Sequence, residues 1–211
     1  MATNNVSTFL QTIGQGIKPN MFSVDIQFPT NGEGDAANFS STDRNLTNIL
    51  CKSAALPGSN LGVIEVPFRG RTVKIAGDRT FDTWSATFFA DRDMEIRALF
   101  EDWANSINTH EANTAPRFLP DDTATGYMAN LYVTQLEKDA EEGGSAIRTY
   151  KLHHCFPTNV SQIDLAYDSN DQIAEFTVEW QYSYFTAGGQ DLNSEASGAP
   201  NSTGASTRTV R

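Results

Sequence analysis

QIAEFTVEWQYSYF, residues 172–185, decides the fold class of this 211-residue chain because its apolar and polar side chains alternate. Six residues fall on an apolar face and five on a polar face: Ala174, Phe176, Val178, Trp180, Tyr182 and Tyr184 against Glu175, Thr177, Glu179, Gln181 and Ser183. A period of two is typical of a half-buried β-strand. We expect one face of this strand to cover a core and the other to meet water or a water-filled space.

Working outward, the sequence repeats this kind of pattern in several short segments. The alternation is cleanest at 21–28, and further β-branched or aromatic runs lie at 61–68, 72–75, 80–90, 127–137, 146–156 and 161–167. Strand follows strand, which predicts mainly antiparallel sheets. Arg69-Gly70-Arg71 predicts a hairpin turn that carries two exposed positive charges. Gly77-Asp78-Arg79 predicts either a local turn with a surface ion pair or a contact to a neighbouring subunit.

A single convincing helical pattern interrupts the strands at about 92–108. Asp91 or Asp93 supplies an N-terminal carboxylate, which suits the positive end of a helix dipole. Apolar residues follow at helical spacing, namely Ile96, Leu99, Phe100, Trp103 and Ile107. The sequence therefore predicts one amphipathic helix that lies against a sheet.

The length and local composition predict one domain with three irregular segments. We expect an N-terminal arm at 1–17, a domain at 18–186 that contains a long polar loop at 30–53, and a tail rich in Gly, Ser and Thr at 187–211. No apolar run approaches the roughly 20 residues of a membrane-spanning helix, and the first residues lack the pattern of a secretory signal. We therefore expect folding in a cytoplasm and no membrane binding.

The charge and the two cysteines exclude further classes of function. A formal net charge of −11 disfavours ordinary nucleic-acid binding, which needs Lys and Arg to replace counterions along the phosphates. Cys51 and Cys155 are too few for a disulfide framework and lack the spacing of a zinc site, so we interpret both as plain thiols.

Residues that could carry catalysis or hold a metal do not converge. His153 and His154 are neighbours in a predicted strand and should point to opposite faces, so both cannot bind one ion or form a pair with Cys155. Gly143-Gly144 precedes a predicted strand, not a helix, and predicts a turn and not a phosphate site. The acidic residues near the helix start should lie on its solvated face. We expect no catalytic residue, no cofactor and no metal.

Several motifs, in order along the chain, resemble the tail tube proteins of T4-like myoviruses. These are Asn20–Val24 (NMFSV), Cys51–Gly58 (CKSAALPG), Lys74–Phe81 (KIAGDRTF), Trp84, Arg97–Trp103 (RALFEDW), Phe156-Pro157 and Glu175–Val178 (EFTV). The resemblance spans about residues 18–186.

The resemblance implies a mainly β fold of two packed antiparallel sheets, sandwich-like or barrel-like, with one flanking helix. It also implies hexameric rings that stack into a virion tail tube inside a contractile sheath. The implied partners are further copies of the chain, the sheath protein, baseplate proteins that initiate the tube, a tail terminator and a tape-measure protein. DNA would pass through the tube without specific binding.

Six residues follow as candidates for function in such a tube. Glu175 and Glu179 lie on the polar face of the 172–185 strand and are candidates to line the channel, where acidic side chains repel phosphates. That face could equally look outward. The candidate contacts between subunits are Arg69, Arg71, Asp78 and Arg79.

Two other classes of protein remain as alternatives. One is the tube of a related contractile secretion or bacteriocin-like machine. The other is a β-sandwich binding module that recognises carbohydrate through exposed aromatics such as Tyr127 or Tyr132. An enzyme is disfavoured because no nucleophile, base and orienting group come together.

Overall fold

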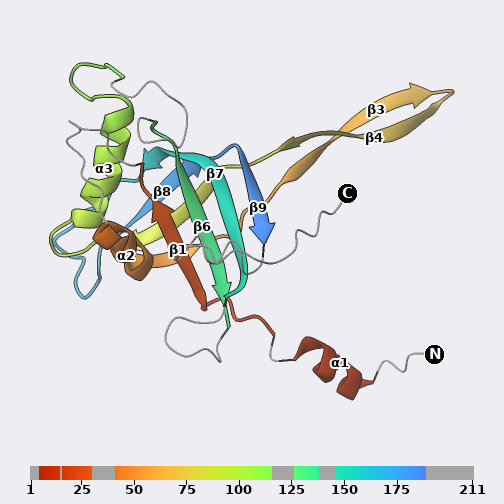
Figure 1. Cartoon of the computed structure of the whole chain (residues 1–211), viewed down its shortest axis with the longest axis horizontal. Helices are drawn as coiled ribbons and strands as arrows, with labels where there is room; N and C mark the ends of the chain where they lie inside the picture. The colour runs from red at the N-terminus through yellow and green to blue at the C-terminus, as the bar shows by residue number, and fades with distance from the viewer. Residues whose placement is uncertain (1–4, 15, 30–40, 116–125, 138–145, 189–211) are drawn as a thin grey trace, which may run out of the picture.

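The computed structural model describes residues 5–14, 16–29, 41–115, 126–137 and 146–188, which form two packed antiparallel sheets, a long hairpin and helices (Figure 1). This confirms the predicted fold class. The expected turn at Gly143-Gly144, much of the loop expected at 30–53 and nearly all of the tail expected at 187–211 lie outside the described residues.

The first sheet has the order β1-β6-β7-β9 and the second β2-β5-β8-β7. The strands of these sheets are β1 (Phe22–Gln27), β2 (Cys51–Ala54), β5 (Trp84–Phe89), β6 (Ala129–Leu136), β7 (Ala146–Val160), β8 (Glu175–Gln181) and β9 (Tyr184–Gly188). Strand β7 belongs to both sheets. Its first part pairs with β6 and β9, and its last residues pair with β8.

The corner between the two sheets lies at His154. This residue has φ 57°, and the register of β6 and β7 shifts at the same place, between Ala129 and Leu131. An extra residue in one strand bends it and increases its twist. The same corner splits the predicted strand 172–185 into β8 and β9, and the amide of Ser183 between them donates to the carbonyl of His153 (3.0 Å).

The core lies between the inner faces of the sheets and is rich in aromatic rings. Phe88, Phe100, Phe176 and Trp180 form a cluster with centroid separations of 5.1 to 6.3 Å. Phe176, Val178 and Trp180 of β8 are all buried, whereas the alternate residues of that strand are half-buried. The predicted alternation of β8 is confirmed.

Helix α3 (Glu95–Ile107) is the predicted helix, and it begins later than expected. Ile96, Phe100 and Trp103 are buried, while Leu99 and Ile107 pack partly buried against the core. Its N-terminus is nevertheless capped by Asp91, whose carboxylate accepts hydrogen bonds from the amides of Glu95 (3.1 Å) and Ile96 (3.3 Å).

Part of the expected loop 30–53 is a helix, which corrects the prediction. Helix α2 (Ser41–Leu50) contacts β1 and α3, and leads directly into β2. Its residues, rich in Asn, Thr and Asp, have low intrinsic helix propensity, so the sequence showed a loop composition. Leu46 and Leu50 pack against the core, and the side chain of Asn48 accepts a hydrogen bond from the amide of Val24 (3.3 Å). Tertiary contacts stabilise this helix.

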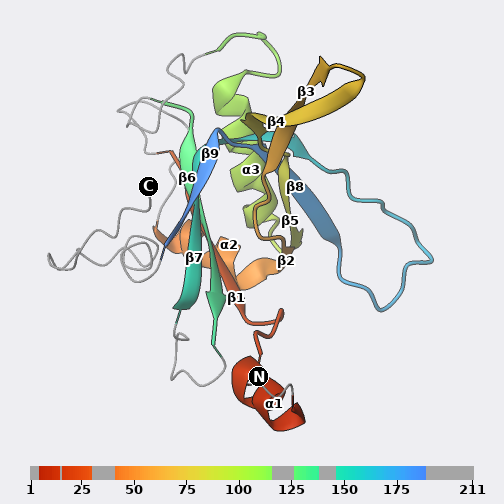
Figure 2. The same ribbon diagram turned by 90° about the vertical axis from the view of Figure 1, so that its right-hand side faces the viewer.

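The predicted strand 161–167 is absent, and residues 161–174 form a loop with no strand pairing. Figure 2 shows this loop, in light blue, standing away from the sheets. Leu165 is 90% exposed and Tyr167 fully so. Alternating apolar residues form a strand only where a neighbouring strand accepts their backbone hydrogen bonds, and this segment has none.

Candidate assembly surfaces

Strands β3 (Asn60–Phe68) and β4 (Arg71–Thr80) form a two-stranded hairpin that extends far beyond the sheets (Figure 1). Nearly every residue on both of its faces is exposed. The exposed side chains include large apolar ones, namely Leu61, Val63, Ile64, Val66, Phe68, Val73 and Ile75. A two-stranded hairpin is marginally stable alone in water, so apolar side chains on both faces indicate a surface that another chain covers.

The tip of the hairpin is the predicted Arg69-Gly70-Arg71 turn. Phe68 pairs with Arg71, which leaves Arg69 (φ 46°) and Gly70 (φ 80°) as a two-residue turn. Positive φ at both positions is the geometry that matches the twist of a hairpin. The guanidinium of Arg69 lies 5.3 Å from the centre of the Phe68 ring. The tip thus presents two cations beside an aromatic ring.

Asp78 and Arg79 lie within strand β4, which corrects the expected turn at Gly77-Asp78-Arg79. Here the two strands lie so close together that a Cβ on Gly77 would be 3.2 Å from the backbone of Gly62. A register shift between Leu61 and Val63 accompanies this approach. The glycine therefore allows the two strands to pack closely where their register is irregular. In the sequence alone, the same three residues have the pattern of a turn.

The outward face of the second sheet is a polar wall centred on β8. Glu179 is flanked across the sheet by Ser85 of β5 and Asn159 of β7. Nearby, the hydroxyls of Thr87 and Thr177 lie 3.1 Å apart, and Gln181 donates to Thr83 (2.8 Å). Polar uncharged side chains surround Glu179, so its carboxylate dominates the charge of this face.

Glu175 lies at the end of the same wall but in a different electrostatic setting. The ammonium of Lys52 in β2 donates to both of its carboxylate oxygens at 2.6 Å. Both side chains are exposed by more than a third, so the pair adds little stability. The structure brings Glu175 and Glu179 to one face, as predicted. Glu175 is paired with Lys52, whereas Glu179 is not paired with this cation.

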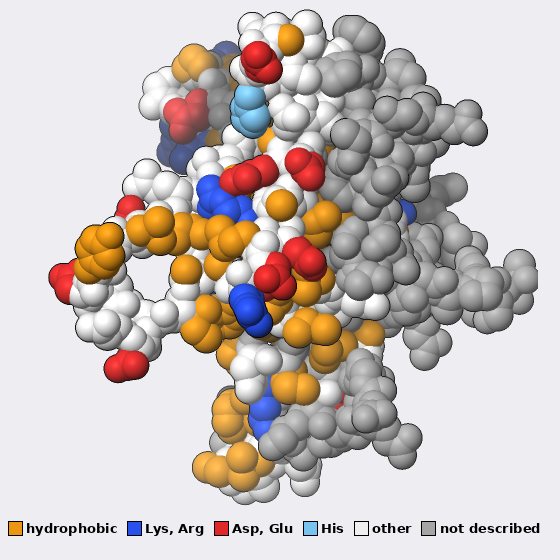
Figure 3. All heavy atoms as spheres, turned by 90° about the vertical axis from the view of Figure 1, so that its left-hand side faces the viewer, with side chains coloured by type: hydrophobic (Ala, Val, Ile, Leu, Met, Phe, Trp, Pro, Cys, Tyr) orange, Lys and Arg blue, Asp and Glu red, His pale blue; other side chains and the backbone are white. Residues whose placement is uncertain are grey.

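The loop 161–174 encloses a hollow of about 800 Å³ at its base, on the left-hand end of the molecule in Figure 1. Figure 3 views this end and shows hydrophobic and acidic side chains on the projecting loop, with an opening between it and the body. The lining includes Phe89, Ile163, Leu165 and Ile173 together with Asp164, Asp171 and Glu175. Sequence reasoning missed this surface because it interpreted 161–167 as a strand.

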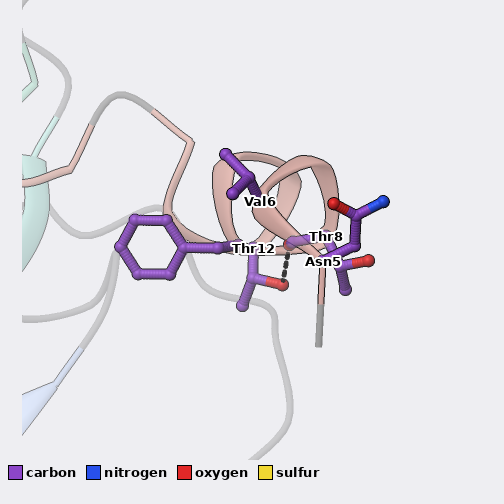
Figure 4. A pocket seen from close by; sticks show the side chains of 5 residues that line it. Asn5, Val6, Thr8 and Thr12 are labelled. Carbon is purple, nitrogen blue, oxygen red and sulfur yellow. Dashed lines mark hydrogen bonds between the residues drawn. The ribbon is translucent and has the colours of Figure 1, made fainter. Parts of the chain in front are cut away.

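Helix α1 (Val6–Ile13), within the expected arm 1–17, presents a second apolar surface that was not predicted. Val6, Phe9, Leu10 and Ile13 recur at helical spacing, yet no residue of the helix is buried. A shallow groove of about 430 Å³ runs along it (Figure 4), where the hydroxyl of Thr12 donates to the carbonyl of Thr8 (2.8 Å). The spacing of these four residues was the available signal for a helix.

His153 and His154 do not point to opposite faces, which corrects the prediction. The positive φ of His154 breaks the alternation of side chains along the strand. Both imidazole rings contact Tyr184, with centroid separations of 4.5 Å for His153 and 5.9 Å for His154. The Nε2 atom of His153 also lies 3.0 Å from the hydroxyl oxygen of Thr186. Within the described residues, no group of three potential metal ligands lies together.

Both cysteines are free thiols, as predicted. Burial raises the pKa of the Cys51 thiol from 9.0 to about 12, and burial also raises the pKa of Cys155. Neither is a thiolate nucleophile near neutral pH. Two of the carboxylates near α3 have structural roles, since Asp91 caps the helix and Glu101 accepts a hydrogen bond from Arg97 (2.6 Å).

Tyr132 is 2% exposed, so it cannot supply the exposed aromatic surface that the carbohydrate-binding alternative requires. Tyr127 is half-buried and stacks edge-on against Phe156 (5.9 Å). Among the described helices, none is long and apolar enough to cross a membrane.

Comparisons with known proteins point to one family. The model of the family described as phage tail tube protein matches residues 17–187. The tail tube protein gp19 of Enterobacteria phage T4 is 30% identical over 172 residues, which cover 82% of this chain and 92% of the relative. The tail tube protein of Serratia phage KSP90 is 28% identical over 134 residues, 64% of this chain and 71% of the relative.

The fold also resembles solved structures. A chain in the cryo-EM structure of an extracellular contractile injection system, the PVC sheath–tube complex in its extended state, aligns with a TM-score of 0.54 at 14% identity. The alignment covers 89% of this chain and 100% of that chain. At this identity the likeness concerns the fold alone.

Proposed function

Because this chain belongs to the phage tail tube protein family, we propose that its copies form hexameric rings that stack into the tube of a contractile virion tail. The tube would hold the tape-measure protein before ejection and pass the genome afterwards. Its partners would be the sheath, the baseplate proteins that initiate the tube and the tail terminator. The arm, domain and tail expected at 1–17, 18–186 and 187–211 belong to this proposal as the units of one subunit.

The observation that carries the proposal is the hairpin β3–β4 with apolar side chains on both faces. Its side chains contribute nothing to the core of their own chain, because that core lies between the two sheets. Burying apolar surface is worth roughly 25 cal/mol per Å², so a projection of this kind favours association. Copies joined around a closed ring also cover sheet edges that would otherwise aggregate.

The polar wall around Glu179 supports the conduit function. A surface of Ser, Thr, Asn and Gln with acidic groups offers phosphates few favourable contacts. Lys52, the cation nearest the wall in the contacts described above, is held by Glu175. We place this face toward the channel, with Glu179 as its acidic group, so that DNA passes without adhesion.

Arg69, Arg71, Asp78 and Arg79 are proposed as contacts between subunits. All four lie on the exposed hairpin. Arg69 in the turn and Arg71 at the start of β4 are at its tip, and Asp78 and Arg79 lie further along β4. Their charges would set the orientation of a neighbouring copy. Charged groups at an interface determine which partner binds, and in which register, more than they increase the binding affinity.

Electron microscopy of the purified full-length chain tests the proposal, across protein concentration and salt and with added baseplates. We expect tubes of stacked rings with a central channel. The matched variant Val63→Asp/Val73→Asp should remain folded and monomeric under the same conditions, because both side chains are exposed on the hairpin. A native chain that stays monomeric even on baseplates would refute the tube function.

A further inference from the structure

The loop 161–174 is built as a docking element. Its two ends are clamped: the amide of Ser161 donates to the carbonyl of Thr177 (2.8 Å), and the amide of Ala90 donates to the carbonyl of Ala174 (2.9 Å). Arg97 of α3 adds a hydrogen bond to the carbonyl of Ser161 (2.9 Å). Between these clamps the loop leaves the body and exposes Leu165, Tyr167 and Ile173. A fixed base with an exposed apolar crest lowers the ordering cost of binding.

The charge of this loop is complementary to that of the hairpin. Residues 161–174 contain Asp164, Asp168 and Asp171 and no Lys or Arg. Residues 60–80 contain four basic and two acidic residues, a net charge of +2 in a chain whose net charge is −11. The hairpin is thus a basic and apolar element, and the loop is an acidic and apolar one.

The two elements lie at opposite ends of the molecule (Figure 1). They cannot meet within one copy, but a head-to-tail arrangement of copies brings the hairpin of one to the loop of the next. Head-to-tail contacts between unlike surfaces generate a ring if the rotation closes and an open filament if it does not. A tube of stacked rings can use such contacts within a ring or between rings.

We propose that the loop 161–174 and the hollow at its base form the docking site for the hairpin tip of a second copy. This inference rests on the proposed tube function and names the acceptor surface for the hairpin. Phe68 packs against the apolar crest and the hollow, and Arg69 and Arg71 face the three aspartates of the loop. Tyr167, fully exposed, offers a ring face to a guanidinium. Glu175 is at the edge of the hollow, which leaves Glu179 to line the channel.

Charge reversal tests the pairing. We expect Arg69→Glu/Arg71→Glu and, separately, Asp164→Lys/Asp168→Lys to raise the concentration needed for tube formation by about tenfold or more, because each places like charges together. The combined four-site variant should recover most of the native assembly. Loop variants that assemble like the native chain, or a combined variant no better than the single pairs, would overturn the proposed docking site.

Crosslinking gives an independent readout. Thr72→Cys and Ser169→Cys, introduced together in a Cys51→Ser background, place one thiol near the hairpin tip and one on the loop. A thiol-specific crosslinker should join copies in assembled tubes and not in the monomer. A chain with only one of the two introduced cysteines should give no ladder, because its other thiol, Cys155, is buried. Native tubes without such crosslinks would refute the inference alone, while a native chain that forms no tubes refutes the proposed function instead.

Discussion

Replacing Phe100 by alanine should remove a large share of the stability of the subunit. The ring is fully buried, and its centroid lies 5.1 Å from that of Phe88, 5.6 Å from that of Trp180 and 6.3 Å from that of Phe176. It joins α3 to the inner faces of β5 and β8. Deleting it removes the aromatic contacts of the helix with the second sheet, although the guanidinium of Arg97 still lies 5.6 Å from the centre of the Phe176 ring.

The magnitude follows from burial and cavity formation. Phe→Ala changes in cores cost about 3–5 kcal/mol, and each well-placed aromatic pair adds roughly 0.5–1.5 kcal/mol beyond its buried area. Three ring neighbours in the second sheet place Phe100→Ala toward the upper end of that range. Single domains are stable by about 5–15 kcal/mol, so the variant should unfold at a much lower urea concentration.

The assay is urea unfolding of the full-length chain at a concentration below that of assembly, followed by tryptophan fluorescence. Phe68→Ala is the matched control: the same substitution at a hairpin ring that is 63% exposed. It should change the unfolding free energy by no more than about 0.5 kcal/mol while weakening tube formation. A loss below about 1 kcal/mol for Phe100→Ala would contradict the packing of α3 against both sheets.

Four further outcomes are expected. Asp91→Ala should lower the unfolding free energy by about 1 kcal/mol, because its carboxylate caps α3, whereas Asp93→Ala, at an exposed position, should change it little; equal urea midpoints for the two variants would contradict the cap. Iodoacetamide should label Cys51 slowly in the folded chain at pH 8 and rapidly in urea. The Cys51 thiol loses its proton at a lower pH in the unfolded chain than in the folded chain. Its contribution to stability is therefore complete below pH 9.0 and is lost as the pH rises toward 12. Urea midpoints measured across this pH range should fall more for the native chain than for Cys51→Ser. Glu179→Lys should slow DNA release from assembled virions, most strongly at low salt, while Glu179→Gln should slow it little; identical release by both variants would place Glu179 outside the channel.

The periodic segments of the sequence are the parts that sequence reasoning predicted well. In β8 the alternation of Phe176, Val178 and Trp180 with polar residues is what the structure shows, and the apolar stripe of α3 is buried as expected. Local periodicity suffices there because burial on one face of a strand or helix forces it. The turn at Arg69-Gly70 was also readable, because its conformation depends on those two residues alone.

The elements that sequence reasoning missed depend on contacts between distant segments. Helix α2 has a loop-like composition and is held through Leu46 and Leu50, whereas 161–167 has a strand-like pattern and no strand beside it. His154 interrupts an otherwise regular strand because two sheets meet there and the chain must turn a corner. The hydrophobic periodicity of each segment does not determine any of these three features.

The sequence by itself determined the mainly β class, the amphipathic helix, the acidic character and the family resemblance, because composition and short periods carry that information. Only the tertiary structure decided which surfaces remain for partners. A strand pattern says that one face is buried, but not whether a neighbour within the chain or in another copy buries it. The hairpin β3–β4 and the loop 161–174 are exposed because the core closes without them, and that is a property of the assembled sheets.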